Sequence, residues 1–239
     1  LGVDAAALKL TFETDIQRTY RVIQFEDAEI EVCVDVGVVR TSGREQTIHE
    51  VEFELKSGSV QSLLAFSFEW VKKYQLWLDV RSKAEMGNLL ALEQTVSPAR
   101  FEKEFVLSKK ESAAHNLSLL IGQQMQHLLP NIAAISAGVA EQSHIDQAQT
   151  ALEHLQLTLA LFKDWNSNIS DKWAMQLAAF KHQFDHLQHL QHMQSTLGAF
   201  LQNPTTTENL AKDILYAQEK LGNLVKSTQN VHHYLELLT

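Results

Sequence analysis

The sequence predicts an α+β protein in which a mostly antiparallel β-sheet is followed by an all-α helical bundle. Residues 29–37 and 48–58 alternate apolar with polar side chains, which is typical of strands with two different faces. Further along the chain, apolar residues recur at helical spacing instead. The pattern changes at the proline-containing stretch TVSPAR (95–100), which we interpret as a linker. Two regions follow from this reading, residues 1–95 and residues 96–239.

Four strands are expected in the first region, at about residues 8–24, 28–36, 47–56 and 76–82. The stretch GVVRTSGREQ (37–46) would form the turn between the second strand and the third.

Two helices are expected beside these strands. Ser59 is a suitable N-cap for a helix over residues 59–74, in which Leu63, Phe66, Trp70 and Val71 recur at helical spacing. This helix should pack on the apolar face of the sheet, and a short second helix should follow Lys83.

Acidic side chains gather on one face of two of these strands. Alternate residues of a strand share a face, so the second strand presents Glu29, Glu31, Cys33 and Asp35 on one side and Ile30, Val32, Val34 and Val36 on the other. The third strand likewise presents Glu50, Glu52, Glu54 and Lys56 opposite Val51, Phe53 and Leu55. Like charges across a sheet destabilise it unless cations intervene. The pattern therefore favours divalent metal ions or basic groups between the carboxylates, although a merely solvated outer face is an open alternative.

Composition limits the classes of partner. The chain has 239 residues, 45% of them hydrophobic, and a formal net charge of −9, which argues against binding to nucleic acid or to an anionic membrane. The one cysteine, Cys33, excludes an internal disulfide, and its acidic neighbours should keep it a protonated thiol. No apolar run reaches the roughly 18 residues of a membrane span. We expect a cytoplasmic protein and, because the sequence begins at Leu1, a fragment of a longer chain.

Four ordered segments, FETDIQRTYRVI, EIEVCVDVG, IHEVEFELKSG and DVRSKAEMG, resemble the second half of a CYTH domain, the triphosphate tunnel metalloenzyme family. They are similar in particular to the bacterial CYTH/CHAD inorganic triphosphatases, which are often labelled adenylate cyclases. The resemblance covers about residues 8–92. It implies a closed tunnel of antiparallel strands that hydrolyses inorganic triphosphate with Mg²⁺ or Mn²⁺. The family's opening ExExK strand and the basic residues of its first half have no counterpart in this sequence.

The resemblance also implies roles for eight residues. Asp35 and Glu31 would be catalytic acids near the metal or the attacking water, Arg18, Lys83 and Lys56 would bind phosphate, and Glu50, Glu52 and Glu54 would hold the metal. Arg21 differs from Arg18 in strand parity and is expected to be an ordinary surface residue. Met86 stands where the family usually has an arginine.

The second region resembles a degenerate CHAD domain. The segment HIDQAQTALEHLQLTLALF (144–162) predicts one helix with an apolar face formed by Ile145, Ala148, Leu152, Leu155, Leu159 and Phe162. Where that family carries arginines and a histidine for polyphosphate, this chain has Asp146, Gln149, Glu153, His154 and Gln156. Residues 97–239 hold 10 Lys and Arg against 13 Asp and Glu, a net charge of −3. Polyphosphate binding is therefore not expected, and a protein partner of the helices is an open alternative.

A histidine-rich stretch, KHQFDHLQHLQHMQ, places His182, His186 and His189 on one side of a helix, opposite Phe180, Phe184 and Leu187. An i, i+4 histidine pair can chelate zinc or nickel. No Cys or Glu completes the ligand set, so a solvated polar face is the favoured interpretation.

Three functions are compatible with the sequence. The favoured one is hydrolysis of tripolyphosphate to diphosphate and phosphate. The same tunnel could act on nucleoside or thiamine triphosphate or cyclise ATP, and the sequence does not separate these because the tunnel recognises the triphosphate. A non-catalytic scaffold with a partner-binding helical module is the third; the loss of the helical arginines favours it, and the retained acidic and basic set argues against it.

Overall fold

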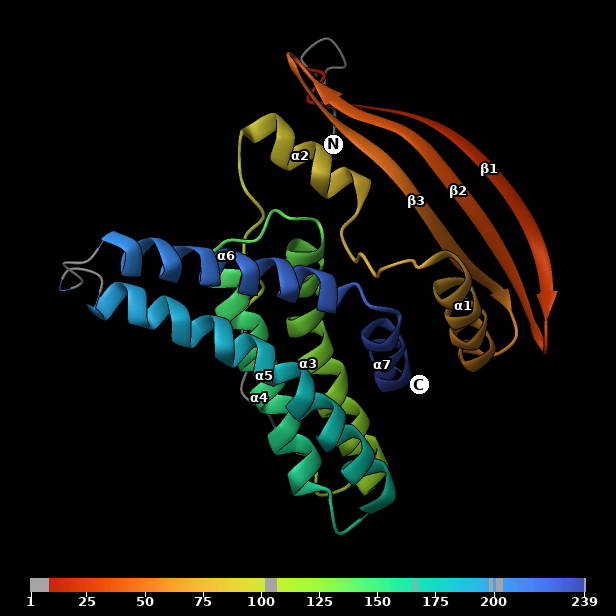
Figure 1. Cartoon of the computed structure of the whole chain (residues 1–239). Coiled ribbons are helices and arrows are strands. Elements are labelled where there is room, and N and C mark those ends of the chain that lie inside the picture. Colours follow the sequence, from red (N-terminus) through yellow and green to blue (C-terminus); the bar gives the residue numbers. More distant parts are fainter. Residues whose placement is uncertain (1–8, 102–106, 166, 198–199, 201–203, 239) are drawn as a thin grey trace. The chain divides into compact units, whose positions relative to one another are not determined.

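The computed structural model describes residues 9–101, 107–165, 167–197, 200 and 204–238. It contains an antiparallel β-sheet and a set of α-helices, which confirms the α+β class (Figure 1). The chain divides into two compact units. The first comprises the described residues up to Trp70 together with Val80–Val96, and the second comprises Val71–Asp79 together with the described part of Ser97–Leu238.

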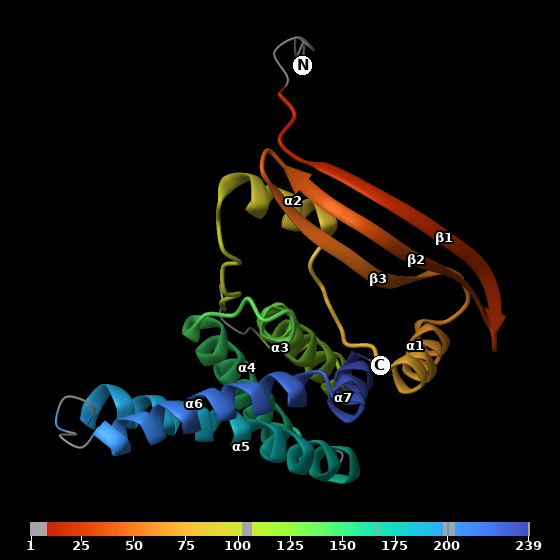
Figure 2. The same ribbon diagram turned by 45° about the horizontal axis from the view of Figure 1, so that its top comes forward.

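Within the described residues the sheet has three strands, β1 (Glu13–Phe25), β2 (Ala28–Thr41) and β3 (Arg44–Ser57), paired in that order. All three are long and strongly curved (Figures 1 and 2). The turn expected over residues 37–46 is wrong, because only Ser42 and Gly43 separate β2 from β3. The β-branched residues of GVVRT extend the strand, and Gly43 supplies the positive φ of 84° that the tight turn needs.

The fourth expected strand, at residues 76–82, is also wrong. This segment has no regular secondary structure and connects α1 (Val60–Tyr74) to α2 (Lys83–Leu92). Its alternating Leu76, Leu78 and Val80 resemble a strand in sequence, but Leu78 packs against the helical core without a strand partner. Trp77 and Asp79 are as partly buried as Leu76 and Leu78, and Val80 is 45% exposed, so the alternation in sequence corresponds neither to strand pairing nor to alternating burial.

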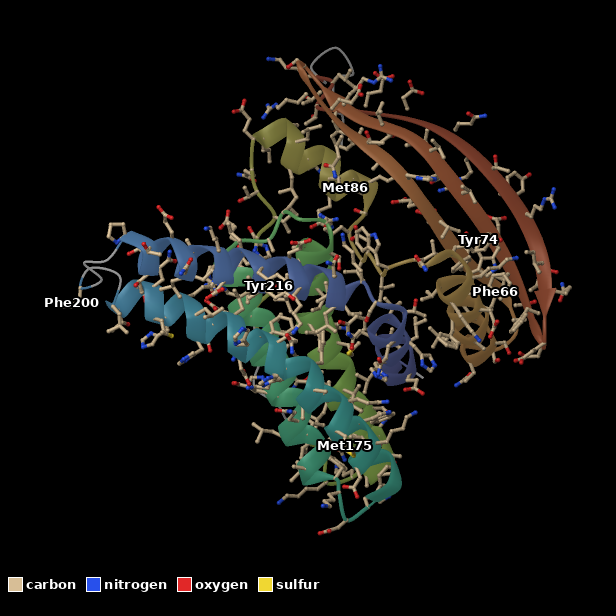
Figure 3. All side chains as sticks on the ribbon, viewed as in Figure 1. Phe66, Tyr74, Met86, Met175, Phe200 and Tyr216 are labelled. Atoms are coloured by element: carbon tan, nitrogen blue, oxygen red, sulfur yellow. The ribbon has the colours of Figure 1, made fainter. Side chains whose placement is uncertain are left out.

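Helix α1 covers one face of the sheet with an aromatic cluster. Phe66 lies beneath the strands (Figure 3) and its ring meets those of Phe25, Phe53 and Trp70 at centroid distances of 5.3, 5.4 and 5.8 Å. The Ser59 hydroxyl accepts a hydrogen bond from the Ser62 amide, which confirms the predicted cap. Ala28, Ile30 and Val32 of β2 are buried in the same cluster.

Helix α2 covers the opposite face at the other end of the strands. Met86 packs there with Val39, Ile48, Phe12 and Ile16. The buried side of β2 therefore changes along its length, from Ile30 and Val32 to Asp35 and Val39. The expectation that Val34 and Val36 continue the packed face is wrong, since Val34 is only partly buried and Val36 is 49% exposed.

The second unit contains α3 (Ala113–Ser136), α4 (Gln142–Leu161), α5 (Ser167–Leu197), α6 (Pro204–Val225) and α7 (Thr228–Leu238) around one apolar core. Helix α4 confirms the helix predicted over 144–162, with Leu152, Leu155 and Leu159 fully enclosed. The side chains of Met175 and Tyr216 lie exposed on this unit (Figure 3). Among the described residues, no helix combines the length and the apolar character that crossing a bilayer requires.

Candidate functional site

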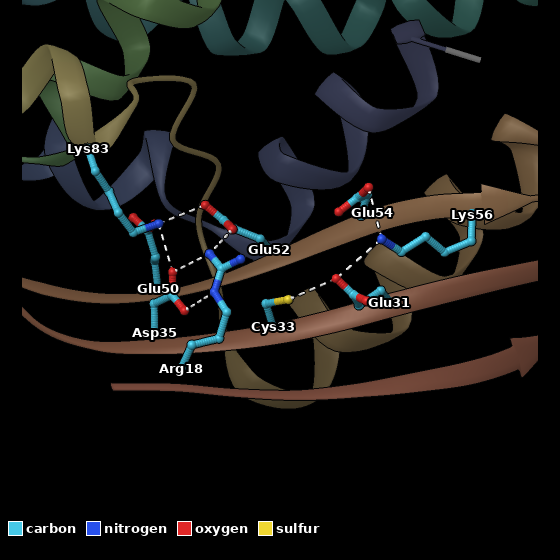
Figure 4. A network of polar contacts seen from close by, with 9 residues as sticks. All are labelled: Arg18, Glu31, Cys33, Asp35, Glu50, Glu52, Glu54, Lys56 and Lys83. Carbon is cyan, nitrogen blue, oxygen red and sulfur yellow. Dashed lines mark hydrogen bonds and ion pairs between the residues drawn. The ribbon is translucent and has the colours of Figure 1, made fainter. Parts of the chain in front are cut away.

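The candidate site is centred on Asp35, in the middle strand of the sheet. Asp35 lies directly opposite Arg18 of β1 and opposite Glu50 of β3 in the strand register. Residues opposite one another in antiparallel strands point to the same face. Side chains of opposite charge are thus brought together from three strands (Figure 4).

Two basic side chains enclose the Asp35 carboxylate, which has no exposed surface. Arg18 donates from Nε to Oδ1 at 2.7 Å and from Nη2 to Oδ2 at 2.6 Å, and Lys83 Nζ lies 2.8 Å from Oδ2. A buried carboxylate is stable only when charged or hydrogen-bonding partners replace its water. The two cations supply those partners.

Lys83 reaches the strands from the first residue of α2. The Ser82 hydroxyl caps this helix by accepting a hydrogen bond from the Glu85 amide, which fixes where the helix begins. The Lys83 ammonium contacts Glu50 and lies 2.8 Å from Glu52 as well as from Asp35. Arg18 also contacts Glu52, at 2.6 Å.

These contacts shift the pKa values of three side chains in the group. The hydrogen bond from Arg18, supported by Lys83 against the effect of burial, lowers the pKa of Asp35 to about 2. The hydrogen bond from Lys83 lowers the pKa of Glu52. Burial would lower the pKa of Lys83, but its bonds to Asp35, Glu50 and Glu52 outweigh burial and raise it. Asp35, Glu52 and Lys83 are therefore charged at neutral pH.

A second group lies on the same face, nearer the end of β3. Lys56 Nζ lies 3.0 Å from Glu54 and 3.3 Å from Glu31, and the Cys33 thiol donates to Glu31 at 3.6 Å. Burial, with the bond to Glu31, raises the pKa of Cys33. The expectation of a protonated thiol is confirmed.

The eight residues singled out in the sequence thus fall into two groups. Arg18, Asp35, Glu50, Glu52 and Lys83 form one, and Glu31, Glu54 and Lys56 form the other, so Glu54 does not lie with Glu50 and Glu52. Arg21 is exposed on the opposite face, as its parity indicates. The catalytic, phosphate and metal roles of these residues stay predictions.

The first group offers the donors that a hard cation prefers. Carboxylate oxygens of Asp35, Glu50 and Glu52 lie within 4.8 Å of one another, and oxygen ligands suit Mg²⁺ and Mn²⁺. The Lys83 ammonium contacts all three carboxylates. The three carboxylates therefore suit a divalent ion, and the Lys83 ammonium already neutralises part of their negative charge.

The described part of the chain holds one further cluster of potential ligands, which the sequence pattern did not single out. His232, His233 and Glu236 come together on α7. The spacing HHxxE was the available signal, but adjacent histidines on a helix point in different directions, so geometry was needed to find it. By contrast, His182, His186 and His189 are exposed on α5, and no group of three potential ligands among the described residues includes them.

Comparison with known proteins gives one relationship in sequence. The chain is 33% identical over 111 residues to a curated protein named inorganic triphosphatase from Haemophilus influenzae. This similarity supports a CYTH-like relationship. The match covers 46% of this chain and 32% of the relative, so the chain spans about a third of the length of the curated relative it matches. No protein-family model matches the chain.

Proposed function

We propose that this chain contributes one wall of an active site that hydrolyses inorganic triphosphate to diphosphate and phosphate. The observation that carries the proposal is the group around Asp35, in which Arg18 and Lys83 interleave with three carboxylates on one sheet face. A merely solvated strand face would not need a fully buried aspartate held by two cations. The similarity to a protein named inorganic triphosphatase gives independent support.

Arg18 and Lys83 would bind the phosphates. Both keep their positive charge at neutral pH, and both contact Glu52, which is 46% exposed at the open side of the group. Phosphate oxygens would replace Glu52 as partners, while Asp35 continues to hold the two cations from below. The planar guanidinium of Arg18 suits bidentate contact with phosphate, and Lys83 adds a point charge. Lys56 would add a third cation further along the same face of the sheet.

Asp35 would serve as a fixed anion rather than as a proton donor. A carboxyl group with a pKa of about 2 stays ionised at neutral pH, so it would hold and orient the two cations. Glu31, further along the same face, would be the second acid near the reacting phosphate.

Glu50 and Glu52, together with Asp35, would hold Mg²⁺ or Mn²⁺. A bound divalent ion would neutralise charge that develops on the phosphoryl oxygens. Glu54, which pairs with Lys56, would act further from this position than the sequence alone indicated. Within the described residues the sheet has only three strands, so the proposal includes further strands that complete a tunnel around the substrate.

The test is phosphate release from tripolyphosphate, ATP and thiamine triphosphate, measured with Mg²⁺, with Mn²⁺ and with EDTA. The full-length gene product should be compared with this 239-residue chain and with a Glu50→Ala, Glu52→Ala variant. The matched control is Glu45→Ala with Glu69→Ala, which removes two exposed acids away from the acidic face.

The proposal expects metal-dependent release from the full-length protein, abolished by the Glu50 and Glu52 changes and unaffected by the control. Faster release from ATP or thiamine triphosphate than from tripolyphosphate would identify that compound as the substrate of the same fold. No release under any metal would favour the scaffold function.

A further inference from the structure

A cluster of metal-binding groups lies on α7, in the helical unit and outside the proposed triphosphate site. His233 Nδ1 lies 3.5 Å from Glu236 Oε2, and His232 Nε2 lies 3.8 Å from Glu236 Oε1. Glu236 follows the two histidines by one helical turn, the spacing at which helix side chains meet. All three residues can therefore direct a ligand atom toward one point, and these atoms lie within 4.8 Å of one another.

The cluster is partly enclosed. The side chains of His232, His233 and Glu236 are 34%, 14% and 24% exposed, so an ion could enter from solvent and still lie mostly within protein. The neighbouring residues Tyr234 and Leu235 face the apolar core.

A cleft between α5 and α7 adjoins the cluster. It is lined by Trp173, Leu177 and Phe180 from α5 and by His233, Tyr234 and Leu237 from α7, and its free space, including the mouth, is about 310 Å³. His233 belongs to both the cleft and the cluster. The lining also includes the polar residues Gln176 and Asn230, and the buried Tyr234 hydroxyl makes no hydrogen bond to any described residue.

One protein cation already contacts the cluster. Lys172 of α5 lies 2.7 Å from Glu236 Oε1 and, with burial opposing it, helps to lower the pKa of Glu236. The second carboxylate oxygen, Oε2, is the one nearest His233. A metal ion could take Oε2 and the two imidazoles while Lys172 keeps Oε1, so the ion pair orients the carboxylate for binding.

We propose that His232, His233 and Glu236 bind one Zn²⁺ ion, with the fourth coordination position directed to the cleft between α5 and α7. Two imidazoles and one carboxylate form a three-ligand set of the kind that leaves a zinc position open for water or another ligand. Imidazole nitrogen also distinguishes this site from the oxygen-only group around Asp35, which suits Mg²⁺ or Mn²⁺. The two sites would therefore select different metals.

The test is calorimetric titration of the purified 239-residue chain with Zn²⁺, repeated with Co²⁺ while the visible absorption of tetrahedral cobalt is recorded. His233→Ala and Glu236→Gln should each weaken Zn²⁺ binding on the order of tenfold or more and remove the cobalt bands. The matched control is His182→Ala with His186→Ala, since these α5 histidines are exposed and could also bind zinc as an i, i+4 pair. A Glu50→Ala, Glu52→Ala variant tests whether zinc binding is independent of the carboxylates around Asp35.

Glu236→Gln keeps the size of the side chain, so it separates loss of a ligand from loss of folding, and thermal unfolding of each variant without metal provides a second check. The proposal requires one Zn²⁺ per chain that survives both controls. Zinc binding that disappears with His182 and His186, or that persists unchanged in the His233 and Glu236 variants, would overturn it.

Discussion

Arg18 and Asp35 form a two-pronged ion pair across the boundary between β1 and β2, with donor–acceptor distances of 2.7 and 2.6 Å. The two residues are direct partners in the strand register. Asp35 is fully enclosed, whereas the Arg18 side chain is 45% exposed. The pair thus anchors the guanidinium at its inner side and leaves an outer side that can meet a ligand.

Arg18→Lys should destabilise the fold although it keeps the charge. A lysine ammonium cannot donate two parallel hydrogen bonds to one carboxylate, so a buried oxygen of Asp35 loses a partner at a cost of about 1–3 kcal/mol. Urea unfolding measures the change. Arg21→Lys, at an exposed side chain on the opposite face of the same strand, is the control and should shift stability by less than about 0.5 kcal/mol. Equal effects of the two substitutions would contradict the special role of the pair.

Asp35 should make stability depend on acid pH. Its pKa is about 2 in the folded state against an ordinary 3.8, so the ionised form stabilises the fold by about 2 kcal/mol above pH 4. This contribution is lost as the pH falls through about 2. Arg18, Lys83, Glu50 and Glu52 face the carboxylate.

The measurement is the free energy of unfolding of the wild type and of Asp35→Asn between pH 7 and pH 2. The deficit of the variant should be largest at neutral pH and should shrink below pH 4, because Asp35 of the unfolded wild type then binds a proton, whereas the folded carboxylate does so only near pH 2. A deficit that stays constant over this range would exclude the ion pairs as its cause.

Lys83→Met should strengthen Mn²⁺ binding while it weakens triphosphate hydrolysis. The Lys83 ammonium contacts the three carboxylates that form the proposed metal ligands, so ion and ammonium compete for the same oxygens. Removing one positive charge should raise Mn²⁺ affinity on the order of tenfold. Titration of Mn²⁺ measures this, with Lys73→Met on α1 as the control. Adding Glu50→Gln should cancel the gain, and weaker binding by Lys83→Met itself would contradict the competition.

Side-chain alternation predicted the three strands, but it could not predict which helix covers each face. Ile30 and Val32 face α1, as expected, yet Val39 and Asp35 are buried on the opposite face because α2 covers that end. Apolar and polar residues alternate with the same period of two whichever face a helix covers. The false strand at 76–82 shows a different limit, since its alternating sequence corresponds neither to strand pairing nor to alternating burial.

The sequence likewise predicted only part of the candidate site. Parity indicated that only one of Arg18 and Arg21 can lie on the face of the acids, the family resemblance favoured Arg18, and the structure agrees with that choice. The sequence did not indicate that Lys83 would reach Asp35 from a helix, because this contact depends on where α2 begins and how it crosses the strands. Nor did it separate Glu54 from Glu50 and Glu52, which alternate identically along β3.

Gly37→Ala should destabilise the sheet and disturb the site with it. A β-carbon at Gly37 would lie 2.1 Å from the Asp15 carbonyl oxygen and 2.9 Å from the Ile16 α-carbon. Both atoms belong to the β1 backbone, which cannot move without shifting the pairing that brings Arg18 to Asp35. Overpacking of this kind should cost roughly 3 kcal/mol. Urea unfolding measures the cost, and phosphate release by the full-length protein should fall with it.

Gly122→Ala is the matched control for this substitution. Gly122 lies within α3, and a β-carbon there meets no atom within 4 Å, so alanine should stabilise the helix by up to about 1 kcal/mol. The two changes add the same methyl group to the chain, and their opposite signs would follow from the backbone that faces each glycine. If Gly37→Ala were as well tolerated as Gly122→Ala, β1 and β2 would have to be spaced more widely at Gly37, and the close alignment of Arg18 with Asp35 would lose its support.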